Sequence, residues 1–277
     1  MADLATHGSI DVKRQTGFGF IAAVCITALY LPILIVLMFS FNNATSIGAS
    51  WQGFSIRWYI SLLQNRGFFD SAVLSIVVAV SATVMATVVA TAAALATTRI
   101  KRWKGQTATI LIITSPLIVP EIVSAVSLLA FFSFVAQALG ISFGIAKLIA
   151  AHTSFCIPFA YLPIRSRLEG MDITLENAAA DLYADRWRTF RHVTMPLLLP
   201  GIMSGAALSF IVSFDDFTIT QLIAGPGETT LPLFLWSRIR NTVTPELNAM
   251  CTLLLMISIA FIVVSFIFTK KNQDEES

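Results

Sequence analysis

Residues 175–201 read LENAAADLYADRWRTFRHVTMPLLLPG, and they form the one substantial polar stretch between long apolar runs of the chain. The stretch includes the adjacent alanines Ala178 and Ala179, and after a fixed gap it reaches Val-x-Met-Pro from Val193 to Pro196. Uninterrupted apolar runs on both sides indicate helices buried in a bilayer. We therefore interpret this stretch as a loop outside the membrane and most of the remaining chain as membrane-embedded.

The composition agrees with a membrane protein. Of the 277 residues, 56% are hydrophobic and 12% are charged, with a mean hydropathy of +0.78, whereas soluble domains average about 25% charged residues. The net charge of +2 is too small to indicate a nucleic-acid partner. Cys25, Cys156 and Cys251 all lie in apolar runs without metal-ligand spacing, so we expect buried, unpaired thiols.

The apolar runs predict an all-α integral membrane protein with six transmembrane helices, since a helix needs about 20 residues to cross a bilayer. Pro116 and Pro120 are expected to break the third of these helices. We expect one transmembrane domain over residues 18–268, between an N-terminal segment 1–17 and a charged, disordered tail 269–277. The expected spans are Phe18–Phe41, Ser71–Thr98, Thr107–Leu139, Ile145–Ile164, Leu197–Ala224 and Ala249–Phe268.

Basic residues give the orientation of these spans. Cytoplasmic loops carry an excess of Lys and Arg, and most of the 18 basic residues fall on one side if the N-terminus is inside. We therefore expect both termini and the loop 165–196 in the cytoplasm. The residues on that side are Lys13, Arg14, Arg99, Lys101, Arg102, Lys104, Arg165, Arg167, Arg186, Arg188, Arg191, Lys270 and Lys271.

The loop 165–196 is expected to hold two short helices. Thr174 can cap the first, Leu175–Ala184, through its side-chain hydroxyl. Asp185 can cap the second, which starts at Arg186 and is expected to stop before Pro196 because proline breaks the helical hydrogen-bond pattern.

These two helices offer a small apolar surface. Ala178, Ala179 and Leu182 form a smooth patch on the first helix, and Trp187 and Phe190, three residues apart, share a face of the second. Such a surface suits insertion into a groove on a partner protein. The alternative is an amphipathic pair lying on lipid headgroups, and the residues alone leave both open. The alternative is favoured by Arg186, Arg188 and Arg191.

The spacing of the loop resembles the cytoplasmic EAA loop of ABC-importer permeases, which reads Glu-Ala-Ala, three residues, Gly, nine residues and Ile-x-Leu-Pro. The register matches here without insertion or deletion, but Asn177 stands in place of Glu and Tyr183 in place of Gly. The resemblance implies that this loop is a coupling helix that docks into a separate ATPase. The residues expected to couple are Glu176, Asn177, Ala178, Ala179, Asp181, Leu182, Tyr183, Val193 and Pro196.

The resemblance extends to the spermidine/putrescine permease branch of this family. It is carried by Ser115-Pro-Leu-Ile-Val-Pro-Glu, by the segment from His152 to Pro158, and by Ser213-Phe-Asp-Asp-Phe followed by Gly225-Pro-Gly, Leu231-Pro-Leu and Thr244-Pro-Glu-Leu-Asn-Ala. It implies a non-enzymatic transport subunit in the bacterial inner membrane, with ATP bound by partner subunits and no cofactor of its own. The implied partners are two copies of the ATP-binding subunit, a second homologous permease and an extracytoplasmic substrate-binding protein.

Three acids are expected in or near the spans, where charge is costly and usually functional. Glu121 falls about 14 residues into the third run, roughly 21 Å along a helix, and Asp215 and Asp216 lie late in the fifth. At similar depth these acids suit a path for a cationic amine. The alternatives are a helix-end cap for the aspartates and an ion pair with Lys147 for Glu121. His152, alone in an apolar run, is expected to be a hydrogen-bonded packing residue.

Other functions remain possible from the sequence. A permease of the same type could carry an opine, iron or sulfate, and intramembrane acids could also serve an ion-coupled secondary transporter. An intramembrane hydrolase would rest on the acids alone, since no HExxH motif or other catalytic pair stands out in the sequence. The sequence also lacks GxxxxGK[ST], so this chain cannot supply the phosphate-binding loop for ATP.

Overall fold

The computed structural model describes residues 16–46, 48–100, 103–241 and 244–274. The remaining parts of the predicted terminal segments, and Lys13, Arg14, Lys101 and Arg102 of the predicted cytoplasmic set, lie outside the described residues. The described residues form helices connected by turns and loops, and one isolated β-bridge pairs Asn42 with Phe54. Six of these helices are long and apolar enough to cross a membrane, which confirms the prediction of a six-span all-α protein.

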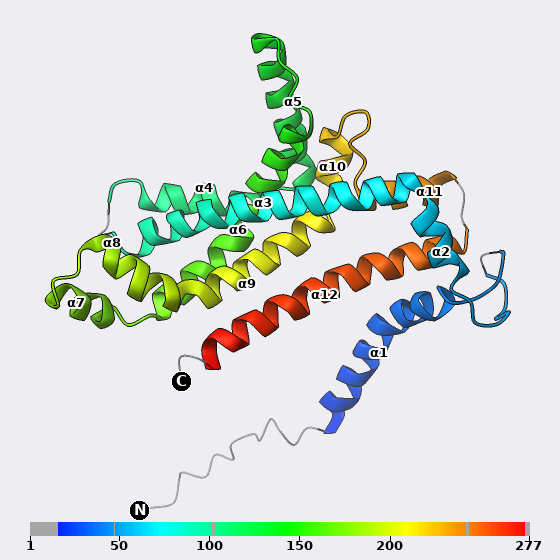
Figure 1. Ribbon diagram of the computed structural model, residues 1–277, viewed down its shortest axis with the longest axis horizontal. Coiled ribbons are helices and arrows are strands. Elements are labelled where there is room, and N and C mark those ends of the chain that lie inside the picture. Colours follow the sequence, from blue (N-terminus) through cyan, green and yellow to red (C-terminus); the bar gives the residue numbers. More distant parts are fainter. Residues whose placement is uncertain (1–15, 47, 101–102, 242–243, 275–277) are drawn as a thin grey trace, which may run out of the picture.

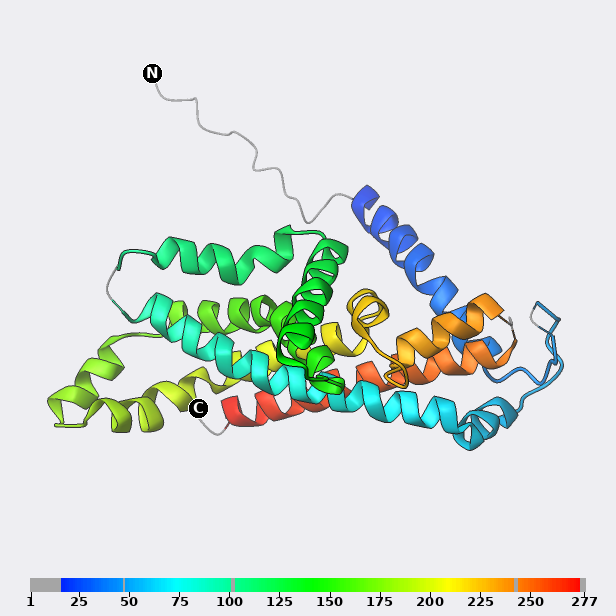
Figure 2. The same ribbon diagram turned by 90° about the horizontal axis from the view of Figure 1, so that it is seen from above.

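The centre of the molecule is a bundle of α3 (Arg66–Thr98), α6 (Ile145–Gly170) and α9 (Met195–Phe214), which pack along one another (Figure 1). Helix α12 (Glu246–Asp274) packs on α9, and α1 (Thr16–Phe39) contacts α12 at the edge. Figures 1 and 2 both show α1 apart from the central bundle. Its apolar side chains are therefore free to meet lipid or another subunit.

Small residues bring the central helices together. The stripe of alanines on α3 is fully buried, and α9 approaches α6 at Gly201 and Gly205. A Cβ at Gly205 would lie 2.7 Å from the Ala160 carbonyl oxygen, and a Cβ at Gly201 would lie 2.7 Å from the Arg167 Cβ. The Ser209 hydroxyl then donates to the Cys156 carbonyl at 3.2 Å. Close helix packing at small residues is a common way to hold helices together in lipid.

Short helices lie at the two ends of this bundle (Figure 1). Helices α2 (Arg57–Gln64) and α11 (Leu231–Asn241) lie at one end, whereas α7 (Thr174–Asp181) and α8 (Arg186–Thr189) lie at the other. Helix α1 ends and α12 begins near α2 and α11. The first described turn of α1 and the last turn of α12 therefore point away from that end.

The predicted third span is divided into two helices, α4 (Gln106–Ile118) and α5 (Glu121–Leu139). Val119 is extended, with φ −76° and ψ 132°, because the residue before a proline is disfavoured in the helical region. The predicted break is confirmed at Pro120 but was wrong at Pro116, which lies inside α4. Glu121 opens a new helix and does not lie within a continuous one. Helix α5 turns steeply away from the bundle axis and packs on α10 (Thr218–Ile223) (Figure 1).

Four further boundaries differ from the sequence prediction. The fifth span ends at Phe214 because α10 is a separate helix, so a continuous run to Ala224 was wrong. The second span starts earlier, at Arg66, and the fourth continues to Gly170. Helix α12 reaches Asp274, so much of the predicted disordered tail is helical. Of the cysteines, Cys156 is buried as expected, but Cys25 is exposed on α1.

We predict that Gly205→Val destabilises the protein by about 1–3 kcal/mol, because the added methyl groups would push α9 away from the Ala160 backbone. Thermal unfolding of the purified chain in detergent measures this loss. Gly19→Val is the matched control, since a Cβ at Gly19 meets nothing within 4 Å. Equal losses in both variants would contradict the importance of this contact.

Candidate functional site: the α7–α8 loop and the paired acids

Aspartate carboxylates bind backbone N–H groups at the start of both short loop helices. The Asp172 carboxylate accepts the Thr174 backbone N–H at 2.9 Å, so the predicted Thr174 cap was wrong: Thr174 is the first residue of α7, and its own N–H is the one being satisfied. This bond holds the pKa of Asp172 below its ordinary value. The predicted Asp185 cap is confirmed, because its carboxylate accepts the Arg188 N–H at 2.8 Å.

Helix α7 ends in a pattern that normally requires glycine. The Ala184 N–H donates to the Ala179 carbonyl at 3.0 Å, and the Tyr183 N–H donates to the Ala180 carbonyl at 2.9 Å. These bonds form a Schellman motif, in which the residue after the C-cap is left-handed. Tyr183 has φ +60°, unlike any other described non-glycine residue. The EAA pattern has glycine at this position, where the backbone is left-handed. In this chain Tyr183 adopts that same left-handed conformation.

Helix α8 does not stop before Pro196. It passes through a π-helical turn, Phe190–Thr194, into α9. There the Met195 N–H donates to the Phe190 carbonyl, five residues back. This wider turn tolerates Pro196 in the first turn of α9, where its missing N–H removes no essential bond. The predicted stop was wrong, and Arg186–Phe214 is one helix of 29 residues.

The predicted coupling residues lie on different faces of the loop. Leu175, Ala178 and Leu182 are exposed on one face of α7, with Leu182 82% exposed. Glu176 points inward: its Oε1 accepts the Arg99 Nε–H at 3.0 Å and the Thr194 hydroxyl at 3.2 Å. Glu176 thus ties the loop to the end of α3 and to the π-helical turn.

The other predicted coupling residues, and the aromatic pair predicted to share a face of α8, are mostly at the surface. Trp187 and Phe190 share a face as predicted, with ring centroids 5.7 Å apart. Trp187 is 66% exposed and, with the exposed face of α7, gives the loop an outward apolar surface, whereas Phe190 is half-buried. Of the remaining residues, Asn177, Asp181, Tyr183 and Pro196 are exposed, whereas Ala179 and Val193 are half-buried.

Two of the three predicted acids come together at the far end of the helix Arg186–Phe214. Asp216 follows the end of α9, and its carboxylate accepts the Thr220 N–H at 3.0 Å and the Ile219 N–H at 3.3 Å. The helix-cap alternative therefore describes Asp216 correctly. The Glu121 carboxyl, at the start of α5, interacts with the side chains of Asp216 and Thr218. The helix breaks between α4 and α5 and between α9 and α10 thus place the carboxyls of Glu121 and Asp216 side by side.

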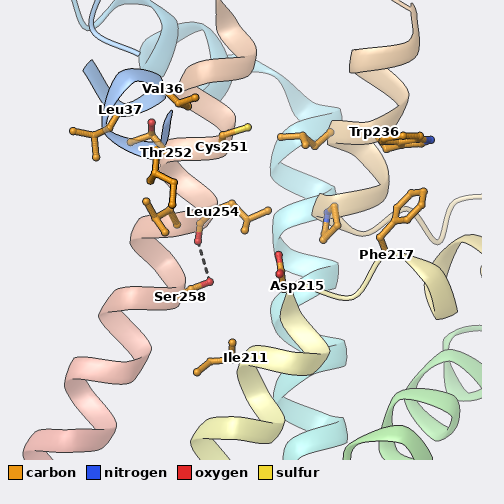
Figure 3. Close-up of a pocket in the computed structure, with 14 residues that line it drawn as sticks. Val36, Leu37, Ile211, Asp215, Phe217, Trp236, Cys251, Thr252, Leu254 and Ser258 are labelled. Carbon is orange, nitrogen blue, oxygen red and sulfur yellow. Dashed lines mark hydrogen bonds between the residues drawn. The ribbon is translucent and has the colours of Figure 1, made fainter. Parts of the chain in front are cut away.

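Asp215 faces elsewhere. It lines a pocket of about 570 Å³ between α1, α9, α11 and α12, opposite Leu254 and Ser258 of α12 (Figure 3). Most of the surrounding side chains are apolar, including Phe217 and Trp236. The three acids therefore do not converge on one point.

A buried histidine supports Asp216 from α6. The His152 Nδ1 lies 2.8 Å from the Ser213 hydroxyl, and its Nε2 lies 3.1 Å from the Thr220 hydroxyl and 3.4 Å from Asp216 Oδ2. The prediction of a hydrogen-bonded packing residue is confirmed. Among the described residues no three His, Cys, Asp or Glu side chains gather as a metal site would require.

Lys147 does not pair with Glu121. Its Nζ lies 3.3 Å from Glu228, which also accepts the Gly225 N–H at 2.7 Å. Glu228 was missed from the sequence, although it follows the turn that begins at Gly225 and ends at Gly227. The alternative of a Glu121–Lys147 ion pair was therefore wrong. The Glu121 carboxyl interacts instead with Asp216 and Thr218.

Serine side chains gather at the break between α4 and α5. A second pocket, of about 250 Å³, opens at the break between α4 and α5 and adjoins the start of α5. Serines were not singled out in the sequence, because they are common at helix contacts in membranes. Four of them line this pocket: Ser115, Ser124, Ser127 and Ser154.

We predict that Tyr183→Gly stabilises the end of α7 by about 1 kcal/mol, because glycine adopts positive φ without the steric cost of a Cβ. Hydrogen exchange of the α7 amides should slow by about fivefold. Leu182→Gly is the control: Leu182 has φ −83°, so glycine there should speed exchange. Faster exchange in Tyr183→Gly would contradict the assignment.

Comparison with known proteins places this geometry in a family. The model described as "Binding-protein-dependent transport system inner membrane component" matches residues 86–272. The spermidine/putrescine transport system permease protein PotC of Haemophilus influenzae is 39% identical over 244 residues, covering 88% of this chain and 93% of its own. The putrescine transport system permease protein PotI of Escherichia coli is 37% identical over 231 residues, covering 83% and 82%.

Solved structures show the same fold. A chain of a bacterial ABC transporter involved in import of the polysaccharide alginate matches with a TM-score of 0.73 at 13% identity, covering 94% of this chain and 97% of its own. A chain of the MetNI methionine ABC transporter matches with a TM-score of 0.60 at 17% identity, covering 77% and 97%. With the family match and the close relatives, these findings show that the chain belongs to the binding-protein-dependent transport system inner membrane components.

Proposed function

We propose that this chain is the permease subunit of an ATP-binding-cassette importer that moves spermidine, putrescine or a related cationic amine into the cell. The paired carboxyls of Glu121 and Asp216 are the observation that carries this proposal. Two carboxyls side by side among hydroxyl groups attract an ammonium group and repel an anion. Relatives named for polyamines at 34–39% identity support the same cargo.

The negative charge of the two carboxyls also distinguishes a cationic amine from the alternative cargoes. Two adjacent carboxyls would repel sulfate, which is an anion. The same charge argues less strongly against an opine or iron. An ion-coupled secondary transporter could use the carboxyls to carry protons. However, it would have no use for the exposed apolar face of α7 and α8.

The importer would contain several subunits around one transmembrane domain, residues 18–268 of this chain. A second homologous permease would cover the apolar faces of α1 and α5 that are exposed in the single chain. Two ATP-binding subunits would lie in the cytoplasm, one of them on the coupling loop 165–196. Both termini would be cytoplasmic, and a binding protein would deliver the amine from the opposite side.

The helix Arg186–Phe214 would couple the two functions. Its first turn lies in the loop that meets the ATPase, and its last residue adjoins Asp215 and Asp216. Movement of the loop as the ATPases close would tilt this helix as a rigid body and shift Asp216 relative to Glu121. Such a shift changes which side of the membrane the carboxyls face, as alternating access requires.

Glu121→Gln tests the cargo site. We expect the polyamine concentration that half-maximally stimulates ATP hydrolysis by the reconstituted complex to rise about tenfold or more, because a charge-assisted bond to the amine is lost. Glu169→Gln is the control, since Glu169 is an exposed acid paired with Arg165 at the other end of α6. An unchanged concentration dependence in Glu121→Gln would contradict contact with the amine.

A further inference from the structure

A third pocket lies at the loop end of the bundle, on the inward face of α7. It has a volume of about 440 Å³ and is enclosed by the end of α3, by α7 and by the helix that begins at Arg186. Its polar lining includes Arg99, Arg186 and Glu176, and its apolar lining includes Leu95, Ala180 and Phe190. This pocket is separate from both the paired carboxyls and the outward face of α7.

Arg99 lines this pocket and carries a buried donor that is not satisfied. Its Nε binds Glu176, but its Nη2 is buried and has no hydrogen-bond partner among the described residues. A buried guanidinium N–H without an acceptor is costly, so such groups normally meet a partner. Arg186 adds a second guanidinium to the lining, whereas Glu176 supplies one carboxylate. The lining therefore carries a net positive charge, and one buried donor of Arg99 has no partner within the described residues.

The position of the pocket indicates the source of the anion. Arg99 directly follows Thr98, the last residue of α3, so its guanidinium lies at one end of a helix long enough to cross a bilayer. Leu95, one turn earlier on α3, lines the same pocket and offers apolar contact next to the charges. A ligand with a phosphate beside an apolar portion fits both halves, which is the chemistry of an anionic phospholipid.

We propose that this pocket binds the headgroup of an anionic phospholipid, with its phosphate held by Arg99 and Arg186. Guanidinium groups bind phosphate through paired, charge-assisted hydrogen bonds, and basic pockets at the ends of membrane helices take anionic lipids. The bound lipid would satisfy Arg99 Nη2 and hold α7 against the end of α3. The loop would then be held in place by Glu176 on one side and by lipid on the other.

Native mass spectrometry of the purified full-length chain in neutral detergent tests this site. Phosphatidylglycerol and phosphatidylcholine with identical acyl chains are titrated separately, and we expect preferential binding of phosphatidylglycerol. Arg186→Gln should weaken that binding by about tenfold or more, as expected when a charge-assisted contact is removed. Arg99→Lys should weaken it as well, because lysine keeps the charge opposite Glu176 but lacks Nη2.

Arg188→Gln is the matched control. Arg188 is a neighbouring arginine that is exposed, faces Asp185 and does not line the pocket, so its loss should leave phosphatidylglycerol binding unchanged. Equal binding of the two lipids, or equal losses in Arg186→Gln and Arg188→Gln, would overturn the site. Displacement of the lipid by low-millimolar inorganic phosphate would assign the pocket to a soluble anion. Loss of a co-purifying ATPase from Arg186→Gln with unchanged lipid binding would assign it to a protein partner, and either result overturns the proposal.

Discussion

The close approach of α9 to α6 is the constraint on which the rest of the structure depends. Gly201 and Gly205 leave no space for a side chain at this contact, and Ser209 adds a hydrogen bond to the Cys156 backbone. Without a hydrophobic driving force between helices in lipid, such close packing is what holds them in register. The helix Arg186–Phe214 is thereby fixed along the bundle, and both ends of it carry groups to which we assign proposed roles in transport.

The π-helical turn makes this long helix possible. A loop that ended before Pro196 would isolate α8 from the membrane and absorb any movement at its surface. The wider turn instead accepts the proline and carries the helix into α9. Glu176 reinforces the junction, because it bonds to Thr194 within the turn and to Arg99 at the end of α3. The loop is therefore built as a stiff extension of the bundle.

At the other end, breaks in two helices allow polar groups to gather. Pro120 separates α4 from α5, and the backbone N–H groups freed at the start of α10 bind the Asp216 carboxylate. His152 supplies another polar contact to the same carboxylate. Irregular backbone is tolerated at membrane depth only where it is buried or lines a cavity. This requirement explains why the carboxyls, the hydroxyls and the helix ends occur together.

Much of this arrangement was predictable from local sequence, and the remainder was not. Apolar run length identified the six spans, and side-chain capping identified Asp185, because both depend on neighbouring residues. Pairings between distant segments were missed: Lys147 meets Glu228 and not Glu121, and Glu176 turns inward to Arg99. Proline was also misread at Pro196, since a helix-breaking residue is harmless when the preceding turn is widened. The sequence shows that Tyr183 stands where the EAA pattern has glycine. Only the structure shows why glycine suits this position, because the residue there has a positive φ angle.

If one rigid helix links the loop to the paired acids, interrupting the helix Arg186–Phe214 should abolish transport. Two glycines inserted between Thr189 and Phe190 would leave both ends intact but remove their rigid connection. Transport by the complete importer in liposomes should then be lost while the ATPase still co-purifies. The same insertion after Gly140, an exposed turn residue with positive φ, should preserve transport. Uptake at the original rate with the first insertion would show that the loop and the paired acids are not linked through this helix.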